Sequence, residues 1–301
     1  MNEMTSRIHN AMTVDVEDYF QVAAFAENIK PENWDNMESR VEENTHRILE
    51  LFSNRNITAT FFVLGWIAER YPDLIRAISE FGHEIACHGY SHQLIYKQDK
   101  SVFLNETKKA KDILENIVGI EVSGYRAASY SITKESLWAL NVLTDLGFVY
   151  DSSIVPVHHD LYGIPDMPRF PHLLNAPNGK ELVEFPPSTL ALPGLNLPIA
   201  GGGYFRLYPY WFSKAALKWV NHHDEIPFVF YLHPWEVDPE QPRMLGKWLS
   251  RFRHYNNLSR CYGRLDNLTQ DFNFTSVKEV LIHQRLINAA VDGHNATLVT
   301  T

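Results

Sequence analysis

The first half of the chain alternates between short apolar runs and longer stretches in which apolar side chains recur every three or four residues. The short runs are rich in β-branched and aromatic residues and predict buried strands at 11–16, 57–65, 84–88, 122–127 and 148–153. The periodic stretches predict helices at 38–56, 71–82, 102–119 and 133–147. Strands that alternate with helices pair in parallel through right-handed crossovers, so we expect an α/β barrel or a doubly wound sheet.

The pattern changes at about residue 155, where proline and glycine become frequent. Residues 155–205 still contain aliphatic side chains, which predicts a loop-rich insertion that packs on the core. A helix at 210–223 and a last core strand at 227–233 follow, and the chain beyond 238 is helical and amphipathic. We therefore predict one domain over 10–275, with a C-terminal extension over about 238–290 and flexible ends at 1–9 and 291–301.

The composition and net charge of the chain argue against some classes of binding partner. The chain has 301 residues, of which 45% are hydrophobic, and a formal net charge of −9 without a dense Lys/Arg run. This charge argues against nucleic acid and against an anionic membrane. The polar start lacks the apolar core of a signal peptide, and no run of about 18 apolar residues occurs. We expect a soluble, cytoplasmic protein without stable membrane insertion; its oligomeric state is not predicted.

Ionisable residues stand at the ends of the predicted strands, where α/β folds carry their chemistry. These strand ends supply Asp15, Glu17, Asp18, His88 with nearby His92, Arg126, Asp151 and His233. Two imidazoles and one carboxylate can hold a divalent metal and leave a position open for water. The spacing of His88 and His92 alone is weak evidence, since such a pair is more often structural. The acids at the neighbouring strand end favour the metal interpretation.

Each of these residues also has a structural interpretation. Asp15 and Glu17 share one face of an extended strand and Asp18 points elsewhere, but a solvated loop would explain the last two acids as well. Arg126 could pair with Asp15 or lie on the surface, and His233 could be a core histidine. We read Cys87 and Cys261 as free thiols, with Cys87 on the side of its strand opposite to His88.

Five short motifs in order resemble the polysaccharide deacetylases of carbohydrate esterase family four, the NodB-homology group. They read TVDVEDY, HGYSH, GYRAASYS, YDSSI and FYLHP and extend from about residue 12 to 236. The variants GGGYFRLYP and HPWEVDPEQPR are similar to the exosortase-associated branch of that group, which is linked to exopolysaccharide production.

The resemblance implies a distorted barrel of about seven strands and a metal-dependent N-deacetylase, with zinc as the expected ion. His88, His92 and an acid, Glu17 in preference to Asp18, would hold the metal, which would bind water and the N-acetyl carbonyl oxygen. Asp15 would take the proton of the water, Arg126 would position Asp15, and His233 would protonate the departing amine. A backbone N–H near Ser129 and Tyr130 would stabilise the oxyanion.

The match departs from the family in three places: the acids are spread over 15–18, Ala128 replaces a proline, and the fourth motif lacks a tryptophan. We expect a less rigid loop at Ala128 and a wall behind His233 made by Leu232 and Trp235. Further substrate-binding candidates are Asp151, Tyr204, Arg206 and Trp235, with glycines 201–203 for close backbone approach. Two alternatives stay open: a cyclic-amide hydrolase of allantoinase type, whose members often lose the metal histidines, and an inactive carbohydrate-binding module.

Overall fold

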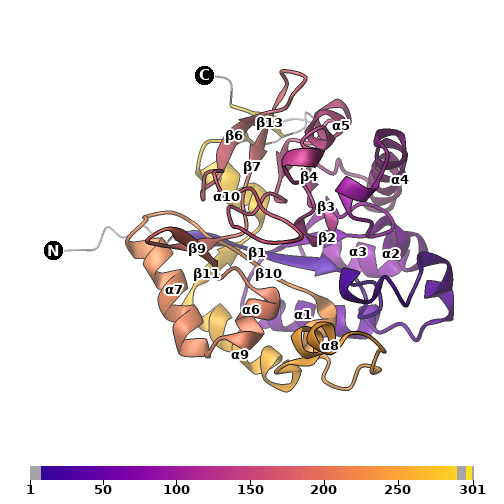
Figure 1. Cartoon of the computed structure of the whole chain (residues 1–301). Helices are drawn as coiled ribbons and strands as arrows, with labels where there is room; N and C mark the ends of the chain where they lie inside the picture. Colours follow the sequence, from indigo (N-terminus) through magenta and orange to yellow (C-terminus); the bar gives the residue numbers. More distant parts are fainter. Residues whose placement is uncertain (1–7, 290–295, 300–301) are drawn as a thin grey trace.

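Seven parallel strands form the centre of the protein. The computed structural model describes residues 8–289 and 296–299 (Figure 1). The parallel strands follow the order β10-β1-β2-β3-β4-β5-β7, with β6 antiparallel to β7 at one edge and β11 parallel to the start of β1. Their bounds are β1 His9–Val16, β2 Thr60–Val63, β3 Glu84–Cys87, β4 Gly124–Tyr125, β5 Tyr150–Asp151, β6 His172–Asn175, β7 Glu181–Glu184, β10 Val229–Leu232 and β11 Asn273–Thr275.

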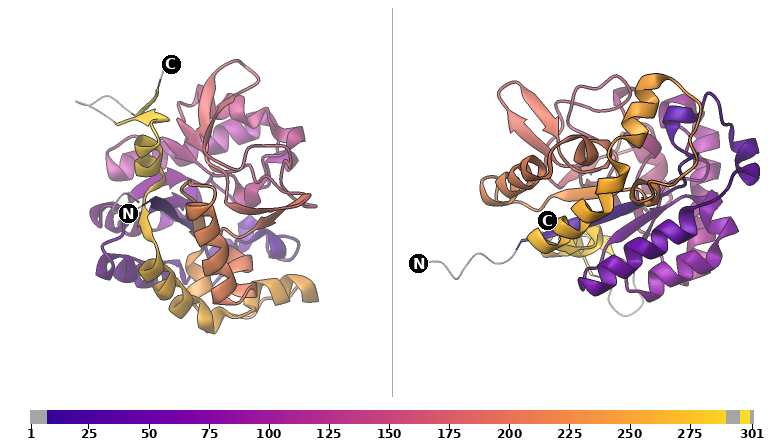
Figure 2. Two further views of the ribbon diagram at one scale, coloured as in Figure 1. Left: turned by 90° about the vertical axis from the view of Figure 1, so that its left-hand side faces the viewer. Right: turned by 90° about the horizontal axis from the view of Figure 1, so that it is seen from below.

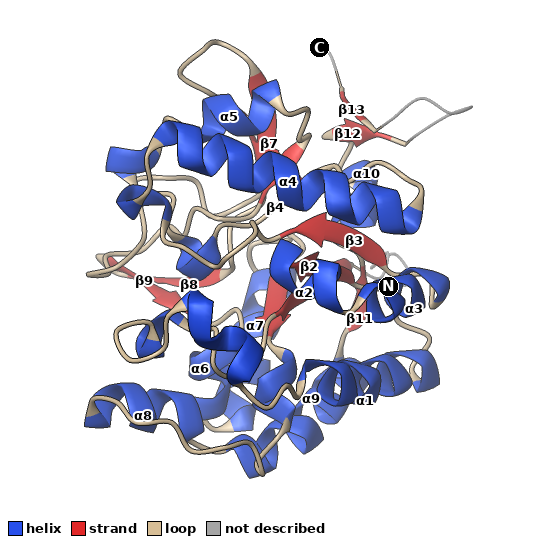
Figure 3. Cartoon of the chain, turned by 90° about the vertical axis from the view of Figure 1, so that its right-hand side faces the viewer, coloured by secondary structure: helices blue, strands red, loops and turns tan. Residues whose placement is uncertain are grey.

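Helices cover the outer face of this sheet, and α2 and α4 lie in front of the strands in Figure 3. The helices are α1 Val41–Asn54, α2 Gly65–Arg70, α3 Pro72–Glu80, α4 Lys100–Val118, α5 Ala139–Asp145, α6 Gly202–Leu207, α7 Tyr210–His222, α8 Trp248–Tyr255, α9 Leu258–Asp271 and α10 Val277–His283. Two hairpins lie outside the central sheet: β8 Thr189–Leu192 with β9 Leu195–Pro198, and β12 Ile287–Asn288 with β13 Thr297–Leu298.

The alternation of side chains along β1 separates two cores. Met12 and Val14 belong to the large cluster between the sheet and the helices, whereas Ala11 packs with Phe62 and Val280 in a second cluster on the other face, against α10. Side chains two residues apart on a strand share a face. Asp15 therefore points to the same side as Ala11, at the carboxyl end of the strand.

The expected α/β fold with about seven parallel strands is confirmed. Within the described residues the hydrogen-bonded order does not close into a complete barrel between β7 and β10. The segment after β7 nevertheless contacts β10, because Val229 N donates to Ser188 Oγ over 2.9 Å and Tyr231 N donates to Ala200 O over 2.8 Å. The distortion of the barrel thus lies at this seam, where loops replace strand pairing.

Several local predictions need correction. Helix α2 was not predicted, because residues 64–70 continue directly from an apolar strand. The glycine-rich stretch also forms a helix, α6, and its close backbone approach is to the protein itself: a Cβ on Gly201 would lie 1.9 Å from the carbonyl oxygen of Tyr231. The end predicted to be flexible contains β13, which pairs with β12; residues 1–7, 290–295 and 300–301 lie outside the described residues.

The helices were also compared with the requirements for crossing a membrane. Across residues 8–289 and 296–299, none of them has the length and apolarity that a bilayer span requires.

Candidate active site

Four neighbouring strands bring the predicted catalytic residues to one end of the sheet. Asp15 lies on β1, and His88, Arg126 and His233 directly follow β3, β4 and β10. The sheet order places β10, β1, β2, β3 and β4 next to one another. Because these strands are parallel, their carboxyl ends meet at the same edge, and residues more than 200 positions apart in the sequence become neighbours.

Asp15 and Arg126 form a buried ion pair. Nη1 of Arg126 donates to Oδ1 of Asp15 over 2.6 Å and to the hydroxyl of Thr13 over 2.8 Å. Nη2 donates to Ser152 Oγ over 2.9 Å, and the guanidinium stacks over the ring of Phe62 at 4.0 Å. The arginine is fully buried and held on every side, so it fixes the orientation of the Asp15 carboxylate.

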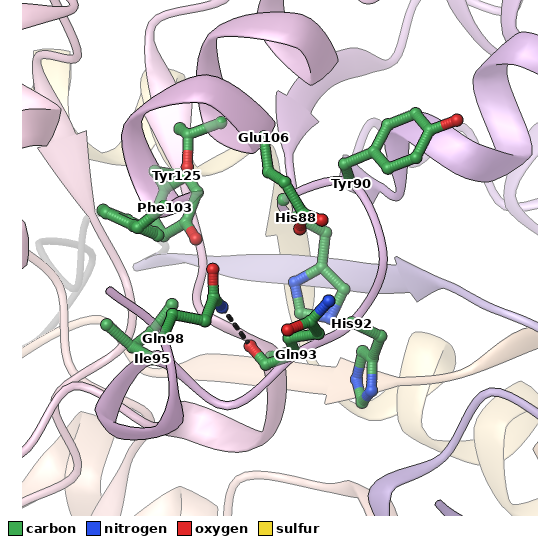
Figure 4. A pocket seen from close by; sticks show the side chains of 12 residues that line it. His88, Tyr90, His92, Gln93, Ile95, Gln98, Phe103, Glu106 and Tyr125 are labelled. Atoms are coloured by element: carbon green, nitrogen blue, oxygen red, sulfur yellow. Dashed lines mark hydrogen bonds between the residues drawn. The ribbon is translucent and has the colours of Figure 1, made fainter. Parts of the chain in front are cut away.

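Three side chains beside this pair have the donor set of a divalent-metal site. One carboxylate oxygen of Glu17 and one ring nitrogen each of His88 and His92 lie within 4.8 Å of one another. The two imidazoles lie next to each other in Figure 4, with ring centroids 5.4 Å apart. Glu17 lies just beyond the end of β1, and the carboxylates of Asp15 and Glu17 both lie near Nε2 of His233, at 3.9 and 3.4 Å.

Each histidine is positioned by the loop after β3. Nδ1 of His88 lies 2.8 Å from the carbonyl oxygen of Arg126, which can only accept, so this nitrogen carries the hydrogen and leaves Nε2 to bind metal. Burial lowers the pKa of His88 to about 4, which keeps the imidazole neutral. Positive φ angles at Gly89 (75°) and His92 (52°) turn the chain, and Ser91 Oγ fixes the turn by donating to Glu106 over 2.7 Å.

The residues present fit a divalent cation. Oε2 of Glu17 is buried, accepts no hydrogen bond from any described residue and lies 2.8 Å from Nε2 of His92. Burial raises the pKa of Glu17, but the imidazoles of His92 and His233 outweigh it, and the pKa lies well below its usual range. A charged carboxylate oxygen without a donor, beside two imidazole nitrogens, is the environment that a metal ion satisfies.

On the other side of Glu17, His233 is arranged as an acid. Its Nε2 lies 3.4 Å from Oε1 of Glu17 and 3.9 Å from Oδ2 of Asp15, and its Nδ1 donates to Oε1 of Glu236 over 2.7 Å. Burial lowers the pKa of His233, but the carboxylates of Glu17, Glu236 and Asp15 outweigh it and raise the pKa to about 9. The imidazole therefore carries a proton that it can donate from Nε2.

A stack of three rings supports His233 from behind. Trp235 lies nearly parallel to His233, with centroids 5.0 Å apart, and the ring of His254 lies on Trp235 at 4.2 Å. Trp235 Nε1 also donates to Oε1 of Glu17 over 3.2 Å. The same indole therefore contacts both the carboxylate of Glu17 and the imidazole of His233. The wall expected from Trp235 is present; His254 was not predicted, because it lies in a helix 21 residues beyond His233.

The loop after β4 is held by hydrogen bonds where the proline is missing. Ala127 N donates to Ser153 Oγ over 2.8 Å, and Ser131 Oγ donates to Ala128 O over 2.6 Å. Ser129 and Tyr130 have φ angles of 52° and 55°. Tyr130 N already donates to Ala127 O over 3.0 Å. Of the two backbone groups considered for the oxyanion, this leaves the N–H of Ser129.

Asp18 lies away from the metal ligands and caps α1. Its Oδ2 accepts from Ser39 Oγ and from the backbone N–H groups of Arg40 and Val41, over 2.8, 2.8 and 3.1 Å. Its Oδ1 accepts from Tyr19 N over 2.9 Å. Asp18 points away because it lies one position beyond Glu17, so the interpretation of Asp18 as a metal ligand is corrected to a structural role.

Two residues expected to bind substrate are instead structural. Asp151 has no exposed surface; its partner across the β5–β7 ladder is Glu184, and both carboxyl groups are buried. Arg206 is 1% exposed and binds Glu236 and the backbone carbonyls of His254 and Asn256. Both predictions were wrong because polar residues near strand ends and in glycine-rich loops can point into the core.

A tyrosine-lined hollow lies next to the predicted catalytic residues. Its walls come from β10, the loop after β4 and the insertion, and include Tyr130, Tyr162, Tyr204 and Tyr231. The buried hydroxyl of Tyr130 has no hydrogen-bond partner in the described part of the chain, and the rings of Tyr231 and His233 are 5.8 Å apart. Of the predicted substrate-binding residues, Tyr130 and Tyr204 line this hollow.

Two family models match consecutive parts of the chain. Residues 33–150 match the polysaccharide deacetylase family, and residues 152–282 match DUF3473, a domain of unknown function. The boundary between them falls at β5, yet Tyr150 of β5 pairs with Val183 of β7, so one sheet joins both regions. The first match covers the histidine pair and Arg126, and the second covers His233.

Curated relatives match over about a third of the chain. A peptidoglycan-N-acetylglucosamine deacetylase of Bacillus cereus is 34% identical over 98 residues, which are 32% of this chain and 36% of that protein. A peptidoglycan deacetylase of Helicobacter pylori is 31% identical over 121 residues, 38% of this chain and 37% of that protein. The chain thus spans little more than a third of the length of these relatives.

Solved structures match over nearly the whole chain at low identity. A polysaccharide deacetylase from Mycobacterium smegmatis, described as putative, has a TM-score of 0.59 and 19% identity and covers 92% of this chain and 91% of its own. The PuuE allantoinase has a TM-score of 0.60 and 18% identity, covering 94% and 92%. At such identities the likeness shows the fold, which is that of NodB-type deacetylases.

Proposed function

Because residues 33–150 form a polysaccharide deacetylase domain that continues into a DUF3473 domain, we propose that this chain is a metal-dependent deacetylase of carbohydrates. It removes N-acetyl groups from N-acetylhexosamine units of a polysaccharide or a lipid-linked saccharide, as part of exopolysaccharide production. One observation supports the proposal: the cluster of Glu17, His88 and His92 lies beside the fixed carboxylate of Asp15 and the imidazole of His233.

Glu17, His88 and His92 would hold the metal, with zinc as the expected ion for this ligand set. A divalent cation bound there activates water and polarises the carbonyl of the N-acetyl group. Asp15 accepts the proton of the attacking water, because Arg126 holds its carboxylate in a single orientation. The N–H of Ser129 donates to the developing oxyanion.

His233 completes the reaction as the acid. An amide has a poor leaving group, so the C–N bond breaks only when the nitrogen is protonated. Nε2 of His233 supplies that proton, and Glu236 stabilises the imidazolium through Nδ1. The stacked ring of Trp235 keeps Nε2 directed at the cluster.

The tyrosine-lined hollow is suited to a sugar. Aromatic faces with hydroxyl edges match the apolar faces and polar rims of a pyranose ring. The wall of the hollow has no charged side chain, which favours a neutral hexosamine over a charged substrate. The free hydroxyl of Tyr130 would receive one hydrogen bond from that ring.

Acetate release from N-acetylglucosamine oligomers, with and without chelator, tests the proposal. We expect release by the metal-loaded protein, loss with chelator and recovery after zinc is added back. His88→Ala is the matched variant, and it should lose both metal and activity. Activity that resists chelation, or hydrolysis of allantoin in place of acetate release, would contradict the proposal.

A further inference from the structure

Helix α8 carries an apolar face that no described element covers. Leu245, just before the helix, and Trp248, Leu249 and Phe252 within it are 80%, 77%, 41% and 50% exposed. At 3.6 residues per turn the three helical side chains fall within an arc of about 100°. His254 lies on the opposite face and is buried. The helix is therefore amphipathic with its apolar side outward, the reverse of a helix that packs on a core.

Basic side chains flank this face. Arg251 and Arg253 lie on its two sides around the helix, and both are exposed. Residues 241–265 contain six basic residues and no Asp or Glu, although the whole chain has a net charge of −9: Arg243, Lys247, Arg251, Arg253, Arg260 and Arg264. Within the described part of the chain, Lys247 is the one residue of the six that forms a salt bridge, with Glu27 at 3.1 Å. Arg251 and Arg253 thus place positive charge on both sides of the apolar face, in a chain whose net charge is −9.

The position of α8 is tied to the active site. Arg206 donates to the backbone carbonyls of Arg253, His254 and Asn256 at the end of α8, over 3.1, 2.8 and 2.8 Å. The same guanidinium binds Glu236, the partner of His233. In Figures 1 and 3 the helix lies at the periphery of the molecule, and the right-hand view of Figure 2 shows it beside the loops of the insertion. The end of α8 is consequently held by the same arginine that binds the partner of His233.

We propose that α8 docks the protein on an anionic lipid surface. Trp248, Leu249 and Phe252 enter the interface while Arg251 and Arg253 contact lipid headgroups, the combination by which helices bind in the plane of a membrane. A second copy of the chain is a poorer occupant, because a two-fold contact would place the arginines of both copies against each other. The charge of the whole chain argued against an anionic membrane; the local arrangement of charge reverses that expectation.

Vesicle co-sedimentation of the full chain tests this contact without any need for activity, so it is independent of the proposed function. Vesicles of equal parts phosphatidylcholine and phosphatidylglycerol are compared with vesicles of phosphatidylcholine alone. We expect binding to the anionic vesicles that weakens with salt and falls at least tenfold in Trp248→Ser/Phe252→Ser. Trp219→Ser on α7, another half-exposed tryptophan, is the control and should bind as wild type does. Arg251→Gln/Arg253→Gln should lose anionic preference, whereas Arg76→Gln on α3 should keep it.

Three results would overturn the proposal. The first is absence of binding to anionic vesicles by the folded protein. The second is equal binding by the Trp248→Ser/Phe252→Ser variant, provided that circular dichroism confirms its fold. The third is a concentration-dependent dimer in analytical ultracentrifugation that the same double substitution abolishes, which would assign the face to a second copy of the chain.

Discussion

Nδ1 of His233 donates to Oε1 of Glu236, and Oε2 of the same carboxylate accepts from Nε of the buried Arg206. Glu236 thus joins the proposed catalytic acid to a guanidinium that also fixes the end of α8. The carboxylate is 1% exposed, and although burial raises its pKa, Arg206 and His233 outweigh burial and lower it to about 2. The carboxylate of Glu236 is therefore charged near neutral pH.

Glu236→Gln should therefore impair stability and turnover together. The buried charge of Arg206 loses its partner, which costs about 3 to 5 kcal/mol of unfolding free energy. The kcat should fall roughly 10- to 100-fold, because the imidazolium of His233 loses its charged acceptor. Denaturant unfolding and steady-state kinetics measure the two effects.

Arg206→Met/Glu236→Gln is the matched control for that substitution. Removing both charges should restore most of the lost stability and little of the lost turnover. Recovery of kcat in the double variant would mean that Glu236 acts only through the fold.

Asp15→Asn and Glu17→Gln should separate the base from the ligand. Asp15→Asn keeps an acceptor for Arg126, so metal content should stay near that of wild type while kcat falls about 10²- to 10⁴-fold. Glu17→Gln removes a charged carboxylate from the proposed metal site. The purified variant should therefore contain less metal than wild type, whatever its activity. Metal analysis after dialysis gives the comparison, and loss of metal in Asp15→Asn would show that the two roles are exchanged.

Asp18→Ala should destabilise the protein and leave the metal in place. The substitution removes the acceptor for Ser39 and for two backbone N–H groups at the start of α1, which costs about 1 to 3 kcal/mol. Thermal unfolding and metal content are measured on the same sample. A variant with native stability and reduced metal content would show that Asp18 binds the metal and does not act by stabilising the fold.

The site could be predicted as far as it depends on strand ends and strand faces. The rule that chemistry lies at the carboxyl ends of parallel strands led to Asp15, His88 and His233, which the structure brings together at one edge of the sheet. These features are local to each strand. The family resemblance added the roles of the residues, which spacing alone left open.

The structural roles of Arg206 and His254 could not be predicted, because their partners are distant in the sequence. Arg206 binds a carboxylate 30 residues away and a carbonyl 50 residues away. Nothing in a glycine-rich stretch distinguishes an arginine for the substrate from one that bridges two helices. The outward orientation of the apolar face of α8 could not be predicted either, because the same amphipathic pattern fits a helix whose apolar face packs on the core.

The structural role of Asp151 could not be predicted either, because its partner Glu184 is distant in the sequence. This buried pair should make the stability of the protein depend on pH. Burial raises the pKa of Asp151 to about 6, although a hydrogen bond with Glu184 lowers it. Burial, together with the neighbouring Asp151 carboxylate, raises the pKa of Glu184 well above its usual range. Both pKa values are higher in the folded than in the unfolded protein, so the folded state binds more protons. This contribution to stability is complete below about pH 4 and is lost as the pH rises past 6.

Glu184→Gln should remove much of that loss. The amide can donate to Asp151 without an added proton, so the unfolding free energy of the variant should fall less between pH 5 and 8 than that of wild type. Denaturant midpoints across that range measure it. Glu181→Gln on the same strand is exposed and serves as the control. Parallel profiles for Glu184→Gln and wild type would contradict the shared proton.

The free hydroxyl of Tyr130 gives the sharpest test of the tyrosine-lined hollow. Tyr130→Phe removes a buried group that has no partner among the described residues, so stability should stay the same or rise slightly. If the hydroxyl binds the sugar, KM should rise about tenfold while kcat changes little, since about 1.4 kcal/mol of binding is lost. Tyr90→Phe is the control, because its hydroxyl binds Glu69 away from the hollow. An unchanged KM in Tyr130→Phe would exclude the hydroxyl from substrate binding.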